Sequence, residues 1–371
     1  MNALRLFGPL ALLLSLMGWL PGAAGADKPS EINFGVASVG VGGRPQVGGN
    51  FIAVAHAKGM LEEEFKADGI KINWFFFKTA GPGVNEAYSN KLLDFAWQGD
   101  LPQIIAKANG LPTKYILAAG RRATYYVAAT EDSSANSIKD LRGRKASIFK
   151  GTCNQLTAAR LLEDEGLTEK DLKVYNMDTN TQTAALASKD VEAVFAGNNL
   201  FSVRDRGLAK IIYNGREHGG KYGCSLGFTV TEDFESKYPD IVQRVVTTLV
   251  KAAKWTSDPA NATAFYQLSA KSGVPFVHFK QDLEGFDLKK NQSPLIDEWF
   301  IESYRRSLAE TKRYGLLREG ADVDLNAWFD TKYLNKALAD LKLEDYWTPE
   351  KVKPGDFWNA GPGPQANAET H

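Results

Sequence analysis

The stretch Val84–Gly99, VNEAYSNKLLDFAWQG, decides the fold of this chain, because a second stretch, Gln182–Gly197, QTAALASKDVEAVFAG, repeats its pattern. Without gaps, the two stretches agree in residue type at five positions: Ala87 with Ala185, Lys91 with Lys189, Asp94 with Glu192, Trp97 with Phe195, and Gly99 with Gly197. Each predicts a short helix, a turn containing lysine, an acidic residue, an apolar strand and a glycine. A unit used twice predicts two similar α/β lobes that face each other, and a cleft between lobes is a common place for a small ligand.

The chain on either side of these stretches alternates between apolar strands and helices. We expect strands over 32–38, 72–77, 94–98, 115–118, 125–130, 145–149, 172–177, 192–196, 211–213 and 226–231. We expect helices over 50–65, from GTCN to about Gly166, and over the amphipathic stretches 239–255 and 296–314. This alternation predicts a largely parallel sheet with helices on both faces. The chain passes from lobe 1 to lobe 2 and back, with crossings near 121–126 and 222–228 that together form a hinge.

The first 26 residues have the pattern of a secretion signal. Arg5 precedes the apolar run Leu6–Leu20, and Ala24-Gly25-Ala26 is a small-x-small cleavage site. The alternative is an N-terminal membrane anchor, but the run is short for a bilayer span. We therefore expect cleavage near Ala26 and an exported mature protein.

Length and charge set the domain organisation and exclude some partners. About 345 residues remain after cleavage, enough for two domains. We expect lobe 1 over 27–121 and 228–360, lobe 2 over 122–227, and a disordered tail over 361–371. Lys+Arg and Asp+Glu both number 44, so no net charge favours nucleic acid. We expect no nucleic-acid partner, no cofactor and a monomer.

The GTCN motif at Gly151–Asn154 lies between a predicted strand and a predicted helix. The free N–H groups of a helix start attract anions, and the helix dipole adds to this attraction. An ordinary capped helix, with Thr152 or Asn154 as the cap, is the alternative. The matching segment of lobe 1, Thr79-Ala80-Gly81, favours the anion site, because two helix starts would then face one cleft.

Several side chains near the predicted hinge have two readings each. Arg121 and Arg122 either clamp a carboxylate or sulfonate in a bidentate manner or are paired within the structure. Asp100 either caps the following helix or receives a ligand ammonium. Trp97 is either a core residue or the aromatic that contacts the ligand.

Motifs typical of other functions fail on their context. The glycines of Gly40–Gly49 lack the G-x-G-x-x-G spacing of a dinucleotide loop, so a mobile loop at the lip of the cleft is the better reading. Gly223–Gly227 matches G-x-S-x-G around Ser225, but a strand follows it where a hydrolase needs a helix. The four histidines have no metal-ligand spacing, which argues against a metal site.

Two cysteines do not make a disulfide framework, although one bridge is allowed in an oxidising compartment. Cys153 and Cys224 both fall at the cleft edge of lobe 2, as a disulfide or as two buried thiols.

The order of these motifs resembles the periplasmic solute-binding proteins of ABC importers, most closely the nitrate/sulfonate/taurine branch. The stretches that carry the resemblance are INFGV, KTAGPGVNEAYSNKLLDFAWQGDLPQIIAKANG, SIKDLRGRKASIFKGTCNQLTAARLLEDEGLTEKDLKVYNM, EAVFAG and TVTEDFESKYPDIVQ, within roughly 31–260. The 39–49 loop, Cys153 and the long part after 285 depart from the family pattern. A second family on this fold makes a pyrimidine precursor of thiamine, but its cysteine-rich loop is absent here.

The resemblance implies a type II periplasmic binding fold, with a ligand cleft between two α/β lobes and two hinge crossings. It implies a non-enzymatic protein that delivers a small anion (sulfonate, taurine, nitrate or a related organic acid) to ABC permease and ATPase subunits in the inner membrane. A ligand sensor of the same fold and an exported serine hydrolase that uses Ser225 are the alternatives. The anion-binding positions that it implies are Ser38, Ala80, Gly81, Gln98, Gly99, Asp100, Thr152, Cys153, Asn154, Gly197 and Asn198, to which the residues themselves add Thr79, Arg121 and Arg122.

Overall fold

The computed structural model describes residues 28–357. The expected signal peptide, its cleavage site near Ala26 and the expected tail over 361–371 lie outside the described residues. Within 28–357, no helix is both long enough and apolar enough to cross a membrane.

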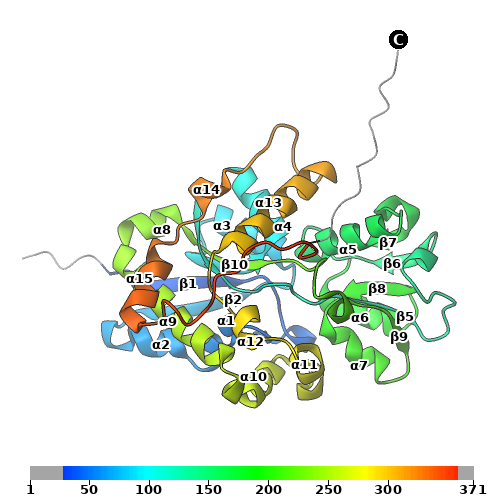
Figure 1. The fold of residues 1–371 in the computed structure, drawn as a ribbon, viewed down its shortest axis with the longest axis horizontal. Helices are drawn as coiled ribbons and strands as arrows, with labels where there is room; N and C mark the ends of the chain where they lie inside the picture. The colour runs from blue at the N-terminus through cyan, green and yellow to red at the C-terminus, as the bar shows by residue number, and fades with distance from the viewer. Residues whose placement is uncertain (1–27, 358–371) are drawn as a thin grey trace, which may run out of the picture.

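Two five-stranded sheets, each with its own helices, lie side by side (Figure 1). In lobe 1 the strand order is β2 (Lys71–Phe76), β1 (Glu31–Val36), β3 (Phe95–Gly99), β10 (Leu226–Thr231) and β4 (Thr113–Ala118). In lobe 2 it is β7 (Lys173–Tyr175), β6 (Lys145–Ser147), β8 (Ala193–Ala196), β5 (Tyr126–Thr130) and β9 (Ala209–Asn214). The two-lobe α/β fold and its two crossings are as expected, whereas the domain boundaries at 121/122 and 227/228 remain predictions.

Each sheet contains one strand that runs against the other four, so the two sheets are mixed, although largely parallel as expected. β10 pairs antiparallel with both β3 and β4, and β5 pairs antiparallel with both β8 and β9. The reason is the path of the chain. β5 and β10 each enter their lobe from the other one, at the end of the sheet where the parallel strands finish, and so they must run in the opposite direction.

The repeated unit of the sequence is also repeated in the structure. The helix α3 (Gly81–Ser89) and the helix α6 (Thr179–Ala187) occupy matching positions in the two stretches. The turns after them place Lys91 at φ 57° and Lys189 at φ 65°, a left-handed conformation that is uncommon for lysine. The two lobes therefore share backbone conformation as well as strand order.

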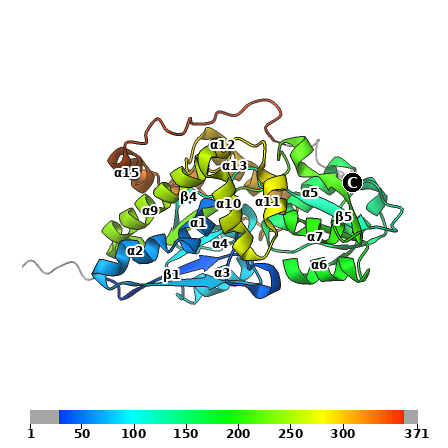
Figure 2. The same ribbon diagram turned by 90° about the horizontal axis from the view of Figure 1, so that it is seen from below.

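Besides α3 and α6, thirteen further α-helices of the described residues surround the two sheets (Figures 1 and 2). They are α1 (Phe51–Ala57), α2 (Met60–Phe65), α4 (Asp100–Ala108), α5 (Cys153–Asp164), α7 (Phe201–Arg204), α8 (Glu232–Lys237), α9 (Pro239–Ser257), α10 (Ala262–Ser269), α11 (Phe276–Leu283), α12 (Leu288–Asn291), α13 (Glu298–Arg313), α14 (Leu325–Trp328) and α15 (Lys332–Leu341). In lobe 2, Val127 and Ala129 of β5 pack in one apolar core, and the alternate residues Tyr126 and Ala128 pack in another. Since successive side chains of a strand point to opposite faces, this sheet is buried on both sides.

The single helix expected over 50–65 is broken into α1 and α2. Asn50 caps α1 as expected, through a bond from Ala53 N to Asn50 Oδ1 of 2.9 Å. Gly59 then adopts φ 60°, which ends one helix and starts the next.

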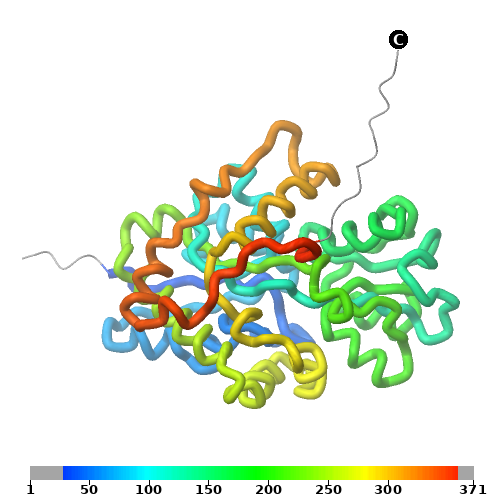
Figure 3. Tube along the Cα trace, in the orientation of Figure 1, coloured from blue at the N-terminus to red at the C-terminus, as the bar shows by residue number. Residues whose placement is uncertain are grey.

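The C-terminal part of the chain reaches both lobes. Figure 3 shows the last segment, in red, crossing from α15 over the connections between the lobes. Helix α13 pairs with α5 through Arg160 and Glu310, 2.7 Å apart and both buried. Helix α11 contacts lobe 2 through Asp282, which accepts a hydrogen bond of 2.6 Å from Tyr126 Oη. This part of the chain therefore flanks lobe 2 on two sides.

Candidate ligand-binding site

A cavity of about 450 Å³ lies where the two sheets face each other. Lobe 1 contributes the residues after β1 and Trp97 of β3, and lobe 2 contributes one side of α6, the residues after β8 and part of α7. The turn before α11 and α11 itself form a third wall. The lining residues are Ser38, Val39, Gly40, Val41, Val47, Gly48, Trp97, Thr179, Asn180, Thr183, Ala184, Ala187, Asn198, Asn199, Ser202, Val203, Arg206, Ser272, Val274 and Phe279. In open α/β sheets, ligands bind outside the carboxyl ends of the strands. This cavity lies beside the residues that follow β1 and β8 and so has the expected position.

Among those lining residues, Arg206 carries the only charge. Its side chain is exposed, and the neighbouring carboxylate of Asp205 is already engaged by Arg204 at 2.6 Å and by His278 at 2.7 Å. No carboxylate of residues 28–357 forms an ion pair with Arg206, and a guanidinium in that state is suited to an anionic group that arrives with the ligand.

The rest of the lining divides into an apolar and a polar part. Trp97, Val274 and Phe279 provide apolar surface, and the indole N–H of Trp97 donates to Ala119 O at 2.9 Å, so the ring position is fixed. Ser38 and Ser202 provide hydroxyl groups. An apolar cavity with few polar groups at defined places is typical of small-molecule sites.

Asn198 connects the cavity to a buried carboxyl group. Its side-chain amide donates to Asp282 Oδ2 at 3.1 Å, and Asp282 also accepts from Tyr126 Oη. Burial raises the pKa of Asp282 to about 6. The orientation of Asn198 therefore depends on a carboxyl group that titrates just below neutral pH.

Of the expected ligand-binding residues, the cavity includes Ser38 and Asn198, and Trp97 is the aromatic expected there. The others do not line it: Thr79, Ala80, Gly81, Gln98, Gly99, Asp100, Arg121, Arg122, Thr152, Cys153, Asn154 and Gly197.

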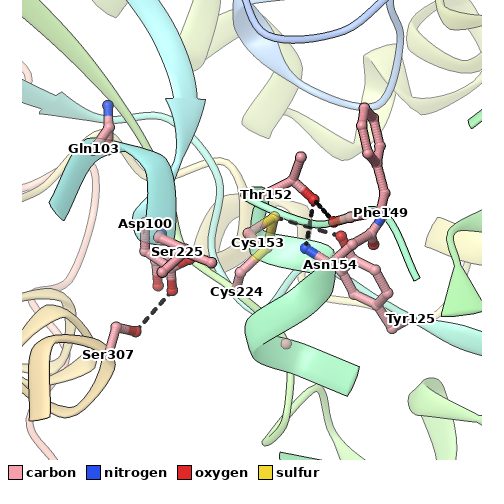
Figure 4. The surroundings of a disulfide bond; sticks show 12 residues. Asp100, Gln103, Tyr125, Phe149, Thr152, Cys153, Asn154, Cys224, Ser225 and Ser307 are labelled. Carbon is pink, nitrogen blue, oxygen red and sulfur yellow. Dashed lines mark hydrogen bonds between the residues drawn. A yellow bond between two sulfur atoms is a disulfide. The ribbon is translucent and has the colours of Figure 1, made fainter. Parts of the chain in front are cut away.

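The start of α5 is occupied by the protein itself (Figure 4). Thr152 Oγ1 donates to Phe149 O at 2.7 Å and accepts from Asn154 N at 3.2 Å, so the hydroxyl group caps the helix. Gly99 of lobe 1 packs directly on Cys153, and a Cβ atom at Gly99 would lie 2.7 Å from the Cβ atom of Cys153. The start of α3, which was expected to face the start of α5, also lies close to it, since a Cβ atom at Gly151 would lie 3.0 Å from Pro82 Cγ. The Thr152 hydroxyl group is engaged within the protein as the cap of α5.

Asp100 belongs to a buried polar cluster. Its Oδ1 accepts from Leu101 N at 2.8 Å and its Oδ2 from Ser307 Oγ at 2.8 Å. Burial raises the pKa of Asp100, and the nearby Arg160 opposes that rise. Asp100 is thus held in the first turn of α4 and does not line the cavity. The expectation that it caps this helix is wrong, because Gly99 is the cap residue and no side chain of the described residues caps α4.

The hinge arginines are paired within the structure. Arg121 is buried and lies 3.1 Å from Asp297, while Arg122 lies 3.0 Å from Glu350 and stacks over the Trp299 ring. With carboxylates already in place, neither guanidinium is available as a ligand clamp, so the structural reading of these two residues replaces the ligand-binding one.

Cys153 and Cys224 form a disulfide, with Cα atoms 5.9 Å apart. The bond joins the start of α5 to the connection that leads into β10 (Figure 4). This is the first of the two alternatives that the sequence left open.

Ser225 has no catalytic surroundings. It is buried, and its hydroxyl group shares a hydrogen bond of 2.8 Å with Ser303 Oγ. Within residues 28–357, no histidine hydrogen-bonds to it, and β10 follows it directly, as the sequence pattern indicated.

Sequence reasoning identified Asn198 but missed the α6 and α7 parts of the lobe 2 wall, and it missed the C-terminal wall of the cavity. The repeat contained a signal for the α6 part, because the gapless alignment that pairs Ala87 with Ala185 also pairs Gly81 with Thr179, the first residue of α6. Arg206 lies in a turn after α7, and no motif marks it.

Comparisons with known proteins agree with this architecture. Residues 51–262 match the model of the family described as NMT1/THI5 like. A Bacillus subtilis (strain 168) protein whose name describes it as aliphatic sulfonates-binding is 25% identical over 300 residues, which cover 78% of this chain and 85% of that protein.

Two solved structures with a similar fold belong to proteins of different function. One is that of a Methylobacillus flagellatus protein named as the periplasmic sulfonate-binding protein of a sulfonate ABC transporter. It is 28% identical, with a TM-score of 0.71, over 88% of this chain and 99% of that one. The other is a desulfurization enzyme, 17% identical, with a TM-score of 0.59, over 84% of this chain and 99% of that one. Since the second likeness concerns the fold only, binding proteins and an enzyme share this architecture.

Proposed function

This chain belongs to the NMT1/THI5-like family, and from that premise we propose that it is the substrate-binding component of an ABC importer that captures a small organic anion, in the first place a sulfonate. The sulfonate-binding names of the relatives support the ligand class. The cavity of this protein gives independent support for an anionic ligand.

The observation that carries the proposal is the position of Arg206. It is the one charged residue among those lining the cavity between the lobes, and none of the lining side chains is a carboxylate. The cavity therefore favours a negative ligand over a positive one. The guanidinium would bind the oxygens of the anionic group, and Ser38 and Asn198 would add hydrogen bonds from the two lobes.

The size and apolar surface of the cavity support an organic ligand over a small inorganic anion. A volume of about 450 Å³ falls in the usual range for small-molecule sites. Trp97 and Phe279 would cover the carbon part of the ligand. Closure of both lobes around the ligand would be favoured because only the closed form lets both contact it.

The location and partners of the protein follow from the same premise. We propose a periplasmic protein, cleaved near Ala26, that acts as a monomer and passes its ligand to the permease and ATPase subunits of the importer. We also propose that it is not an enzyme. The buried Ser225, paired with Ser303, supports this reading over a serine hydrolase.

Titration calorimetry tests the proposal. We expect butane-1-sulfonate to bind wild-type protein, and Arg206→Ala to weaken that binding by roughly ten- to a hundredfold, because one charge-assisted contact is lost. Arg305→Ala is the matched control, since Arg305 is an exposed arginine of α13 that pairs with Glu302. Absence of sulfonate binding to wild-type protein, or equal affinity in Arg206→Ala, would overturn the assignment.

A further inference from the structure

The 39–49 loop lies between the two lobes at the lip of the cavity. It follows β1, and Val39, Gly40 and Val41 line the cavity. On the lobe 1 side the loop is anchored where Gly49 N donates to Ser269 Oγ at 3.0 Å. In Figure 2 the loop, in blue, lies beside the start of α6, in green.

One side chain of lobe 2 binds the tip of this loop at two points. Asn180 Nδ2 donates to Gly40 O at 3.2 Å, and Gly42 N donates to Asn180 Oδ1 at 3.3 Å. A primary amide has both a donor and an acceptor, so it satisfies a carbonyl and an N–H group of the loop at once. A carboxylate would lack the donor and a lysine would lack the acceptor.

The position of Asn180 is itself fixed. Asp178 caps α6 by accepting from Asn180 N at 3.0 Å, and the same carboxylate lies 3.5 Å from Lys78 Nζ of lobe 1. The first turn of α6 therefore makes two separate contacts with lobe 1, through Asn180 to the loop and through Asp178 to Lys78. Both contacts depend on the two lobes being close together.

We propose that Asn180 is a positioning residue that latches the 39–49 loop across the mouth of the cavity and so holds the closed form. This inference rests on the proposed function for its purpose, since a latch that slows opening retains the ligand. Its geometry does not depend on which anion is bound.

Hydrogen–deuterium exchange of the ligand-free, full-length mature protein tests the latch. Gly42 is exposed, so its amide is protected chiefly by the bond to Asn180. In Asn180→Ala we expect exchange in peptides covering 39–49 to speed up by roughly tenfold. Asn180→Asp keeps the acceptor for Gly42 N and loses the donor to Gly40 O. Its exchange rate in the 39–49 peptides should therefore lie between those of wild type and Asn180→Ala.

Ser188→Ala is the control, because Ser188 lies at the opposite end of α6 and its hydroxyl group bonds within lobe 2. Unchanged exchange of the 182–188 peptide shows that α6 remains folded in each variant. Exchange of the 39–49 peptide within twofold of wild type in Asn180→Ala would overturn the latch.

Dissociation of butane-1-sulfonate gives a second readout. Asn180→Ala should release it several-fold faster than wild type, with less change in the association rate. If wild-type protein binds no sulfonate, the proposed function fails, yet the exchange experiment still decides for or against the latch.

Discussion

Removal of the disulfide between Cys153 and Cys224 should lower the stability of this protein by a predictable amount. The bond closes a loop with a sequence separation of 71 residues. In the chain-entropy description, a loop of that length restricts the unfolded chain by about 4 kcal/mol at 25 °C. The double variant Cys153→Ala/Cys224→Ala keeps the Cβ atom that packs on Gly99 and removes only the sulfur atoms.

The measurement is guanidinium-induced unfolding of three samples: oxidised wild type, reduced wild type and the double alanine variant. We expect the two samples without the bond to unfold at similar denaturant concentrations, both well below that of oxidised wild type. Thiol titration of denatured, non-reduced wild type should find no free thiol. Two free thiols, or a free energy of unfolding that changes by less than about 1 kcal/mol on reduction, would refute the reasoning.

Three further predictions follow from the described contacts. Thr152→Ala should cost about 1 kcal/mol of stability in urea unfolding, because a helix cap is lost, and should leave sulfonate affinity in calorimetry unchanged; a large loss of affinity would return the site to the start of α5. Arg160→Met should destabilise by about 3–5 kcal/mol, because it leaves the buried Glu310 carboxylate without its cation, whereas Arg305→Met should have little effect in the same assay. Burial raises the pKa of Asp282 to about 6, so its ionisation costs more in the folded than in the unfolded chain. That cost is absent at low pH, grows as the pH rises through the unfolded pKa of about 4, and is nearly complete at about pH 7. Asp282→Asn should therefore gain stability relative to wild type between about pH 4 and pH 7, and a difference that stays constant with pH would contradict this.

Local patterns in the sequence predicted those parts of the fold that depend on local interactions. The repeat predicted the helices α3 and α6 and the lysine-containing turn after each, because helix length and the following turn are set by neighbouring residues. The left-handed conformation of Lys91 and Lys189 was not predicted and is a finding of the structure. The sequence did not predict the direction of β5 and β10, because strand direction depends on which lobe the chain comes from, and residue patterns within a strand are the same either way.

The candidate site was predictable only where it follows directly from strand ends. Ser38, Trp97 and Asn198 lie at or just after the ends of β1, β3 and β8, and they line the cavity. The GTCN motif around Thr152 has the residue pattern of an anion site at a helix start, but Gly99 packs against Cys153 in the space beside it. A contact between residues this distant in the sequence cannot be predicted from the local pattern around Gly99 or from the pattern around Cys153.

The placement of β10 has a consequence for how the chain is made. β10 lies between β3 and β4 in the lobe 1 sheet, yet it is synthesised after every strand of lobe 2. The chain is synthesised from its N-terminus. Before β10 is made, all the strands of lobe 2 are present, but in lobe 1 β4 has no neighbouring strand and β3 has an unpaired edge. Open edges invite pairing with other chains. Completion of the lobe 1 sheet therefore waits for residues 226–231, and a chain truncated before them would be an aggregation hazard even though four of the five lobe 1 strands and all the lobe 2 strands had already been made.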